Sequence, residues 1–356
     1  MATVPVSQLK QGERIIENVM TKFNNVLFTR GKVVTERDLE ILRAFMIPSV
    51  QIDSKNLDAE EAAGAEAGSA ESAAVSLPFH DWYERMLQLL RRIFKTANSG
   101  GQNLPILDIR TTLEGLIKHI DQYDILTFNP KQFQLQDFVY HNSIMVSLTS
   151  YHLAKWAGMP VKDLLPIALG GLFHDIGTAK IDPAILYKPT KLSVQELEEM
   201  KQHTVIGYNI LKSVPAINEG VKLCALQHHE REDGSGYPLG ARGDKIHMYA
   251  KIVAISDMFH AMRTDRFHKK GISPYLVLEQ LQDEAFGKME PVLVQTFVQK
   301  ITSFQNGMLV KLSDNSIGEI VFSDRAHPTR PWVNVNGNIV NLTTARSLYI
   351  QDVIQK

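Results

Sequence analysis

The segment LPIALGGLFHDIG, residues 165–177, ends an apolar run with an adjacent histidine and aspartate, His174 and Asp175. A neighbouring imidazole and carboxylate offer a nitrogen and a bridging oxygen to divalent metal ions. The apolar run predicts a helix that holds both side chains rigidly, and its two glycines allow a neighbouring backbone to approach closely. The pair also fits an ordinary helix C-terminus with Gly177 in the left-handed conformation. Ligands from distant segments would decide between these interpretations.

The composition of the 356-residue chain is that of a soluble globular protein with two or three domains. Its 38 Lys and Arg residues nearly balance 39 Asp and Glu residues, so no overall field favours a nucleic acid polymer. Because the only cysteine is Cys224, no internal disulfide can form, and the twelve histidines direct any metal site toward nitrogen and oxygen ligands. Residues 1–10 lack a signal-peptide pattern and no apolar run has the length of a membrane span, so we expect a cytoplasmic protein.

Hydrophobic periodicity divides the chain into four segments. Residues 1–53 alternate β-like runs with one helix and predict a small α+β module, whereas residues 54–77, dominated by Ala, Glu, Gly and Ser, predict a linker. Residues 78–305 have helical period almost throughout. Residues 306–356 alternate apolar and polar positions and predict a small β module, with hairpin turns at the Asp-Asn and Asn-Gly pairs.

Inside the helical segment, several predicted helices place an ionisable side chain on their inner face. His141 shares a stripe with Asp137, and a capping box of Ser193 and Glu196 predicts one helix through residue 214 with His203 on its inner side. The inward-facing set is His141, His174, Asp175, His203, His228, His229 and Asp257.

Burying this set without partners would be costly, and a shared metal centre removes that cost. The set is too large for one tetrahedral zinc ion, so it predicts two or more divalent ions. Any one of these histidines is by itself more typical of a hydrogen-bonded core residue. Only the joint set favours a polynuclear site.

Residues 230–238, EREDGSGYP, leave directly from the last two candidate histidines. The glycines and Pro238 predict a tight loop in which Gly236 and Pro238 present Tyr237 beside the histidines. The alternative is a plain surface turn, which the direct exit from two candidate ligands disfavours.

Taken together, these motifs resemble the HD-GYP family, a branch of the HD-domain phosphohydrolases, over residues 137–270. The resemblance implies a helical HD-type domain. With the modules predicted at either end, the expected fold is mainly α, a helical HD-type domain flanked by the small N-terminal α+β and C-terminal β modules. It also implies two or three divalent metal ions, most often Fe or Mn, and hydrolysis of the bacterial second messenger cyclic di-GMP.

Carried over by position, the resemblance implies roles for individual residues. The metal ligands would be His174, Asp175, His203, His228, His229 and Asp257, with Asp175 bridging, while His141 and Asp137 stand where some members bind a third ion. Substrate contacts would come from Tyr237, Gly236, Pro238, Arg266 and Lys269.

The sequence departs from the family pattern at two places. Thr178 stands where the family commonly has a lysine directly after His-Asp-x-Gly, so Lys180 is the nearest lysine and is assigned with Asp175 to catalysis. His260 stands where Asp is usual after the metal-binding Asp257. The expected reaction is attack by metal-activated hydroxide on a phosphodiester, giving linear pGpG and, after a second cut, GMP.

Two further functions stay open. One is a catalytically weak sensor or adaptor that binds cyclic di-GMP and signals through protein contacts. The other is an HD-type phosphohydrolase for different nucleotides, which the Gly-Tyr-Pro loop disfavours. Cyclic di-GMP is the expected small-molecule partner, and signalling proteins and a second copy of the chain, as a homodimer, are candidate macromolecular partners.

Overall fold

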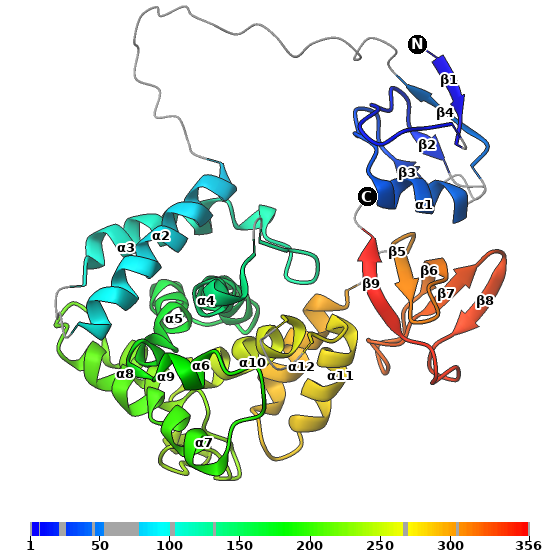
Figure 1. Cartoon of the computed structure of the whole chain (residues 1–356). Helices are drawn as coiled ribbons and strands as arrows, with labels where there is room; N and C mark the ends of the chain where they lie inside the picture. Colours follow the sequence, from blue (N-terminus) through cyan, green and yellow to red (C-terminus); the bar gives the residue numbers. More distant parts are fainter. Residues whose placement is uncertain are drawn as a thin grey trace, which may run out of the picture. The chain divides into compact units, whose positions relative to one another are not determined.

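The chain divides into two compact units, which are Ser76–Ser303 and the combination of Met1–Val75 with Phe304–Lys356. We call them the helical unit and the terminal unit (Figure 1). The computed structural model describes residues 2–6, 8–20, 26–44, 47–52, 78–99, 104–130, 133–265, 270–303 and 306–354. The linker predicted at 54–77 lies outside these residues. In the described part of the chain, no helix combines the length and apolarity needed to cross a membrane.

The helical unit confirms the mainly α fold predicted from periodicity. Its helices are α2 (Phe79–Asn98), α3 (Ile106–Lys118), α4 (Phe138–Trp156), α5 (Val161–Phe173), α6 (Pro183–Leu186), α7 (Val194–Lys201), α8 (His203–Lys212), α9 (Glu219–Gln227), α10 (Met248–Arg263), α11 (Pro274–Glu284) and α12 (Pro291–Ile301). Short 3₁₀ helices join some of them: η1 (Ile120–Gln122), η2 (Leu135–Asp137), η3 (Ile176–Lys180) and η4 (Gly243–Lys245).

At the centre of this unit, α4 packs against α5 and α10 (Figure 1). Most residues of α4 are buried on all sides, as expected for a helix inside a core. A Cβ on Gly171 of α5 would lie 2.9 Å from the Cα of Ser147 in α4, so a larger residue would force the two helices apart. The close approach predicted for the glycine pair is thereby confirmed, and it fixes the end of α5, where the His-Asp pair begins.

The capping box predicted for the next helix is confirmed, but the helix length was wrong. The Ser193 N–H donates to Oε2 of Glu196 at 2.6 Å, and the Glu196 N–H donates to Oγ of Ser193 at 3.3 Å. Instead of running through residue 214, the helix ends with α7, and α8 begins at His203. Two side chains donate to backbone carbonyls at the end of α7. The His203 imidazole bonds to the carbonyl of Met200, and the Thr204 hydroxyl bonds to the carbonyl of Lys201.

In the residues that the structure describes, the terminal unit combines three sheets with one helix. Strand β1 (Ala2–Pro5) pairs antiparallel with β4 (Ser49–Ile52), β2 (Val19–Met20) pairs with β3 (Val26–Phe28), and α1 spans Glu36–Ala44. The C-terminal sheet is antiparallel in the order β8-β7-β6-β5-β9, with β5 Leu309–Leu312, β6 Ile317–Phe322, β7 Trp332–Val335, β8 Asn338–Asn341 and β9 Ile350–Ile354. Positive φ angles at Asn315, Asn336 and Gly337 confirm both predicted hairpin turns.

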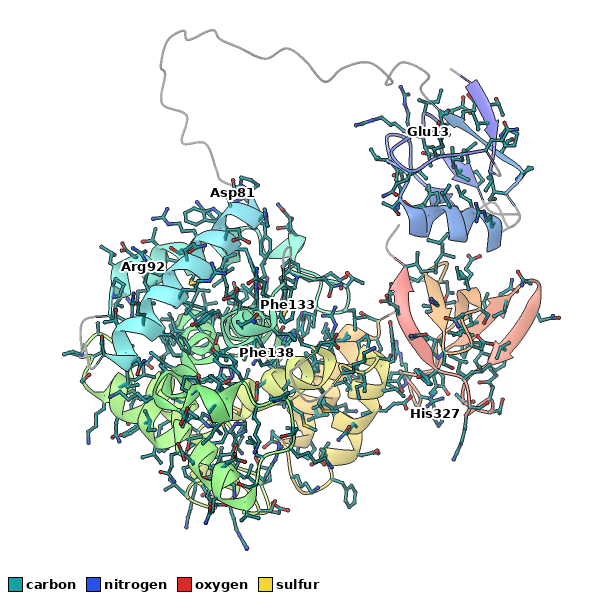
Figure 2. The ribbon with its side chains drawn as sticks, viewed as in Figure 1. Glu13, Asp81, Arg92, Phe133, Phe138 and His327 are labelled. Carbon is teal, nitrogen blue, oxygen red and sulfur yellow. The ribbon has the colours of Figure 1, made fainter. Side chains whose placement is uncertain are left out.

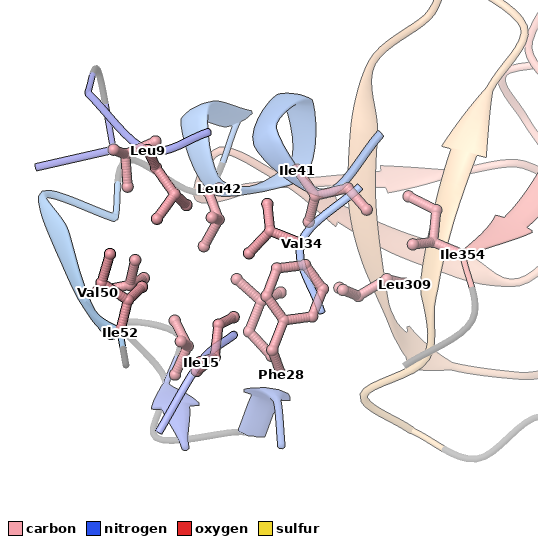
Figure 3. Packing of buried hydrophobic residues seen from close by; sticks show 13 residues of the cluster. Leu9, Ile15, Phe28, Val34, Ile41, Leu42, Val50, Ile52, Leu309 and Ile354 are labelled. Atoms are coloured by element: carbon pink, nitrogen blue, oxygen red, sulfur yellow. The ribbon is translucent and has the colours of Figure 1, made fainter. Parts of the chain in front are cut away.

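The two ends of the chain share one hydrophobic core (Figure 3). Leu309 of β5 and Ile354 of β9 are 2% and 4% exposed, and they belong to the same cluster as Phe28, Val34 and Ile41 from the N-terminal segment. Segments 1–53 and 306–356, which the sequence pattern treats as separate modules, therefore contribute to one folded unit.

Candidate metal centre

Three buried histidines of the helical unit share one orientation. Each Nδ1 lies near a backbone carbonyl of the preceding turn, at 2.7 Å for His174, 2.6 Å for His203 and 2.9 Å for His228. Because a carbonyl oxygen only accepts, each Nδ1 must carry the proton and donate it. In the neutral ring each Nε2 then keeps its lone pair, which is the form of histidine that binds a metal.

Asp175 lies among these three imidazoles, just past the end of α5. Its Oδ2 is 3.2 Å from Nε2 of His174, whereas its Oδ1 is 3.4 Å from Nε2 of His203 and 3.7 Å from Nε2 of His228. The two oxygens of one carboxylate therefore face different histidines, which is the arrangement a bridging ligand requires.

Helix α10 adds a second carboxylate. Oδ1 of Asp257 lies 3.4 Å from Nε2 of His174 and accepts a hydrogen bond of 3.0 Å from the Asn142 amide of α4. His229 completes the cluster, with its ring centroid 4.1 Å from that of His228 and 5.2 Å from that of His203.

The potential ligand atoms form two groups, in each of which they lie within 4.8 Å of one another. The first contains Asp175, His203, His228 and His229, and the second contains His174, His228 and Asp257. His228 falls in both groups, but its single Nε2 lone pair can bind one ion.

The donor set fits divalent cations. Nε2 of His174 is fully buried and makes no hydrogen bond of acceptable geometry, although it faces two carboxylates. Burial lowers the pKa of His174, but the negative charges of Asp175 and Asp257 outweigh burial and raise that pKa well above its usual range. The site thus attracts a positive charge, and a metal ion would supply it in place of a proton.

His229 is in the opposite electrostatic situation. Burial lowers its pKa well below the usual range, and the neighbouring His228 and His203 lower it further. A histidine that stays neutral is available as a metal ligand near neutral pH.

Gly177 explains how η3 comes close to His203 at the start of α8. The left-handed conformation considered for it is wrong, since Gly177 lies inside η3 and is not among the positive-φ residues. A Cβ at this position would collide with the backbone of His203 and Gly207. Glycine is required for close contact between η3 and α8, and this contact brings Asp175 next to His203.

His141 and Asp137 lie outside both ligand groups. His141 faces the core as predicted, with 1% exposure, and its Nδ1 lies 3.0 Å from the hydroxyl of Tyr83 in α2. Arg91, also in α2, donates to Asp137 through Nε at 3.2 Å and through Nη2 at 2.7 Å. Arg91 therefore already neutralises the Asp137 carboxylate, and the Tyr83 hydroxyl fixes the ring of His141.

A pocket of about 260 Å³ opens above the cluster. Asp175, His203, His229 and Asp257 line one part of it, together with Thr178 and Tyr237. The rest is mainly apolar, and Phe138, at the start of α4 in Figure 2, belongs to it. The other lining residues are Leu135, Val139, Ile185, Leu186, Tyr187, Leu192 and Met200.

Only some of the predicted substrate-binding residues lie at the pocket. The Tyr237 ring packs on His229 with 4.7 Å between centroids, and Gly236 and Pro238 flank it in the loop. Lys180 is exposed at the end of η3 and does not line the pocket, whereas Thr178 does. Arg266 and Lys269 lie outside the residues that the structure describes.

Sequence reasoning missed three polar residues around this site. Asn142 supports Asp257, while Tyr83 and Arg91 hold His141 and Asp137. The one available signal was the position of Asn142 next to His141 in a helix whose faces are all buried. Nothing in the sequence connects Arg91 with Asp137, because the two residues are 46 positions apart and belong to different helices.

Comparison with known proteins shows what this chain is similar to. Residues 124–291 match the family model described as HD domain. The cyclic di-GMP phosphodiesterase PA4108 of Pseudomonas aeruginosa is 25% identical over 336 residues, which are 89% of this chain and 81% of the relative. The cyclic di-GMP phosphodiesterase PdeB of Borreliella burgdorferi is 27% identical over 207 residues, 57% of this chain and 54% of the relative.

Among solved structures, Bd1817, a HDG"Y"P protein from Bdellovibrio bacteriovorus, superimposes with a TM-score of 0.51. The comparison covers 83% of this chain and 97% of that chain, at 16% sequence identity. This likeness establishes the fold alone.

Proposed function

We propose that this chain, which carries an HD domain over residues 124–291, is a metal-dependent phosphodiesterase that hydrolyses cyclic di-GMP. The observation that carries the proposal is the position of Asp175 at the base of a pocket, with one carboxylate oxygen facing His174 and the other facing His203 and His228. The names of the relatives from Pseudomonas and Borreliella supply the substrate. The helical domain, residues 78–305, would be the catalytic part.

The ligands in this proposal are His174, Asp175, His203, His228, His229 and Asp257. Because the donors are imidazoles and carboxylates without a thiolate, they suit Fe or Mn. Divalent ions at such a site supply Lewis-acid activation of water and neutralise phosphate oxygens.

We assign two ions rather than three. A third ion would need His141 and Asp137, and the guanidinium of Arg91 already neutralises that carboxylate with two hydrogen bonds. Binding another cation there would break this partly buried ion pair and bring two positive charges close together.

The chain's own residues would hold the substrate and the nucleophile in line. Asp175 and Asp257 keep the ligand cluster negatively charged, and the backbone carbonyls behind three histidines fix their orientation. The apolar lining around Phe138 would accept a base and exclude water, and Tyr237 would contact the nucleotide beside His229. The expected product is pGpG, with GMP from a second cut, and Arg266 and Lys269 are assigned to the phosphates. Lys180 is exposed outside the pocket lining, so it would act only on a substrate that extends beyond that lining.

One observation favours a second function, a cyclic di-GMP sensor of low activity. Among the described residues that line the pocket there is no lysine or arginine, and Thr178 occupies the place where a lysine is common in the family. If the pocket supplies no side-chain cation to the phosphates, transition-state stabilisation would be weaker than ground-state binding.

The two functions are separated by one experiment. Protein purified without air is reconstituted with Mn or Fe, its metal content is measured, and it is incubated with cyclic di-GMP, 3′3′-cGAMP and ppGpp. Appearance of pGpG supports the phosphodiesterase, with Asp175→Asn as the inactive control. Binding of cyclic di-GMP without turnover in metal-loaded protein supports the sensor, and selective turnover of ppGpp contradicts both.

A further inference from the structure

A carboxylate next to the candidate ligands belongs to neither ligand group. Glu230 follows His229 directly, and only 3% of the residue is exposed. Its Oε1 accepts the Leu239 N–H at 2.7 Å, and its Oε2 accepts the Ala241 N–H at 2.9 Å. Each oxygen therefore has its own backbone donor, which is a charge-assisted pair of bonds.

These two bonds close the segment that carries the pocket tyrosine, residues 230–241, which we call the Tyr237 loop. Within it the Tyr237 N–H donates to the carbonyl of His229 at 3.2 Å. Gly236 packs so tightly that a Cβ would meet the backbone of His229, Glu230 and Arg231. The loop thus folds back onto the end of the histidine pair.

The far side of the loop has little apolar burial to hold it in place. Leu239 is 64% exposed, and Gly240 next to it is exposed as well. The near side has separate ties, because the Glu232 N–H donates to the carbonyl of Lys288 and its carboxylate pairs with Lys251 at 2.9 Å. Weakly packed segments open at low free-energy cost unless hydrogen bonds hold them.

We propose that Glu230 is a positioning residue: by binding two amides of the Tyr237 loop, it holds the Tyr237 ring against His229 and so shapes the substrate pocket. This role rests on the proposed function for its effect on substrate, but the clamp itself is a property of the folded chain. It requires both carboxylate oxygens, because a glutamine offers one acceptor and would turn an N–H donor toward the other amide.

The test compares Glu230→Gln with wild-type protein and with Glu232→Gln, a matched change of a carboxylate in the same loop that points toward Lys251 instead. Backbone amide exchange at Leu239 and Ala241 is measured by NMR or mass spectrometry, metal content by elemental analysis, and KM and kcat with cyclic di-GMP. Glu230→Gln is expected to keep its metal, to exchange these amides about tenfold faster, and to raise KM about tenfold with kcat changed less than about threefold. Glu232→Gln removes a tie on the near side of the loop only, so the Leu239 and Ala241 amides are expected to exchange as in wild type and the metal content to stay unchanged.

Three outcomes overturn the role. Unchanged exchange at both amides would show that Glu230 does not hold the loop, and faster exchange with unchanged KM would show that the loop does not position the pocket. An equal effect of Glu232→Gln would remove the specificity of the assignment. If wild-type protein hydrolyses nothing, the proposed function fails, and the exchange measurement still decides the clamp by itself.

Discussion

Arg91 holds Asp137 through both of its carboxylate oxygens, with Nε 3.2 Å from Oδ1 and Nη2 2.7 Å from Oδ2. The pair joins α2 to the start of α4, beside the candidate metal centre. The Asp137 hydrogen bond and negative charge raise the pKa of Arg91, as expected for a strong pair. A guanidinium in this place makes an ion unnecessary for neutralising Asp137.

The first prediction concerns the number of ions. Asp137→Asn should leave about two equivalents of Mn bound, because the residue is paired with Arg91 and not with metal. His141→Ala should do the same, since His141 lies outside both groups of potential ligands. Elemental analysis of the reconstituted variants checks this, and loss of one equivalent in either variant would show that a third site exists.

Asp175→Asn should have the largest effect on metal binding. An amide cannot bridge two cations as a carboxylate can, so metal content should fall below one equivalent and hydrolysis by more than about 100-fold. Asp182→Asn is the control, because Asp182 caps α6 at an exposed position. Retention of two ions by Asp175→Asn would remove the bridging role.

Asn142 should tune metal affinity from behind Asp257. Its amide donates to Oδ1 of Asp257, so Asn142→Ala should weaken metal binding about 10- to 100-fold. Ser143→Ala is the matched control, because the buried hydroxyl of Ser143 has no hydrogen-bond partner. The affinity of both variants for Mn is measured by titration. Equal affinities would contradict the support role of Asn142.

The acid stability of the fold should depend on His260. This histidine is fully buried, and burial, aided by the charge of Arg263, lowers its pKa to about 3. In the unfolded chain its pKa is near 6.5. Between pH 6.5 and 3 the unfolded state therefore binds a proton that the folded state does not, so stability is lost as the pH falls through this window.

The expected contribution is about 1.4 kcal/mol of unfolding free energy per pH unit. His260→Gln removes the titrating group, so its stability should fall less steeply with acid than that of wild type. Urea unfolding of both proteins without metal at pH 6.5, 5.5 and 4.5 measures the two slopes, and equal slopes would contradict the assignment.

The shared core of the terminal unit gives a fifth prediction. Leu309→Ala should destabilise this unit by about 2–5 kcal/mol, as for other buried leucines. Amide exchange at Ile15 and Val34, whose N–H groups bond within the N-terminal segment, should then accelerate although the change lies at the other end of the chain. Ile339→Ala, at a site 63% exposed on β8, should leave both amides protected. Unchanged exchange in Leu309→Ala would mean that the two segments fold independently.

The sequence was informative where a pattern is local. Helical period placed His203, His228 and Asp257 on inner faces, and the capping box at Ser193 fixed the start of α7. Periodicity gives the face of a helix but not the residue that meets it from another helix. For this reason the sequence did not reveal the pairing of Arg91 with Asp137. Nor did it indicate that Leu309 and Ile354 complete the N-terminal core.

That core also has a consequence for the helical unit, since residues 76–303 lie between the two segments that build it. As long as the terminal unit stays folded, it ties together both ends of the helical unit, much as a non-covalent cross-link would. A tied chain has fewer unfolded conformations than a free one, by an amount that grows with the logarithm of the loop length. The terminal unit would thus stabilise the helical unit by lowering the entropy of its unfolded state. Cleaving the chain between the helical unit and either segment of the terminal unit would remove this contribution.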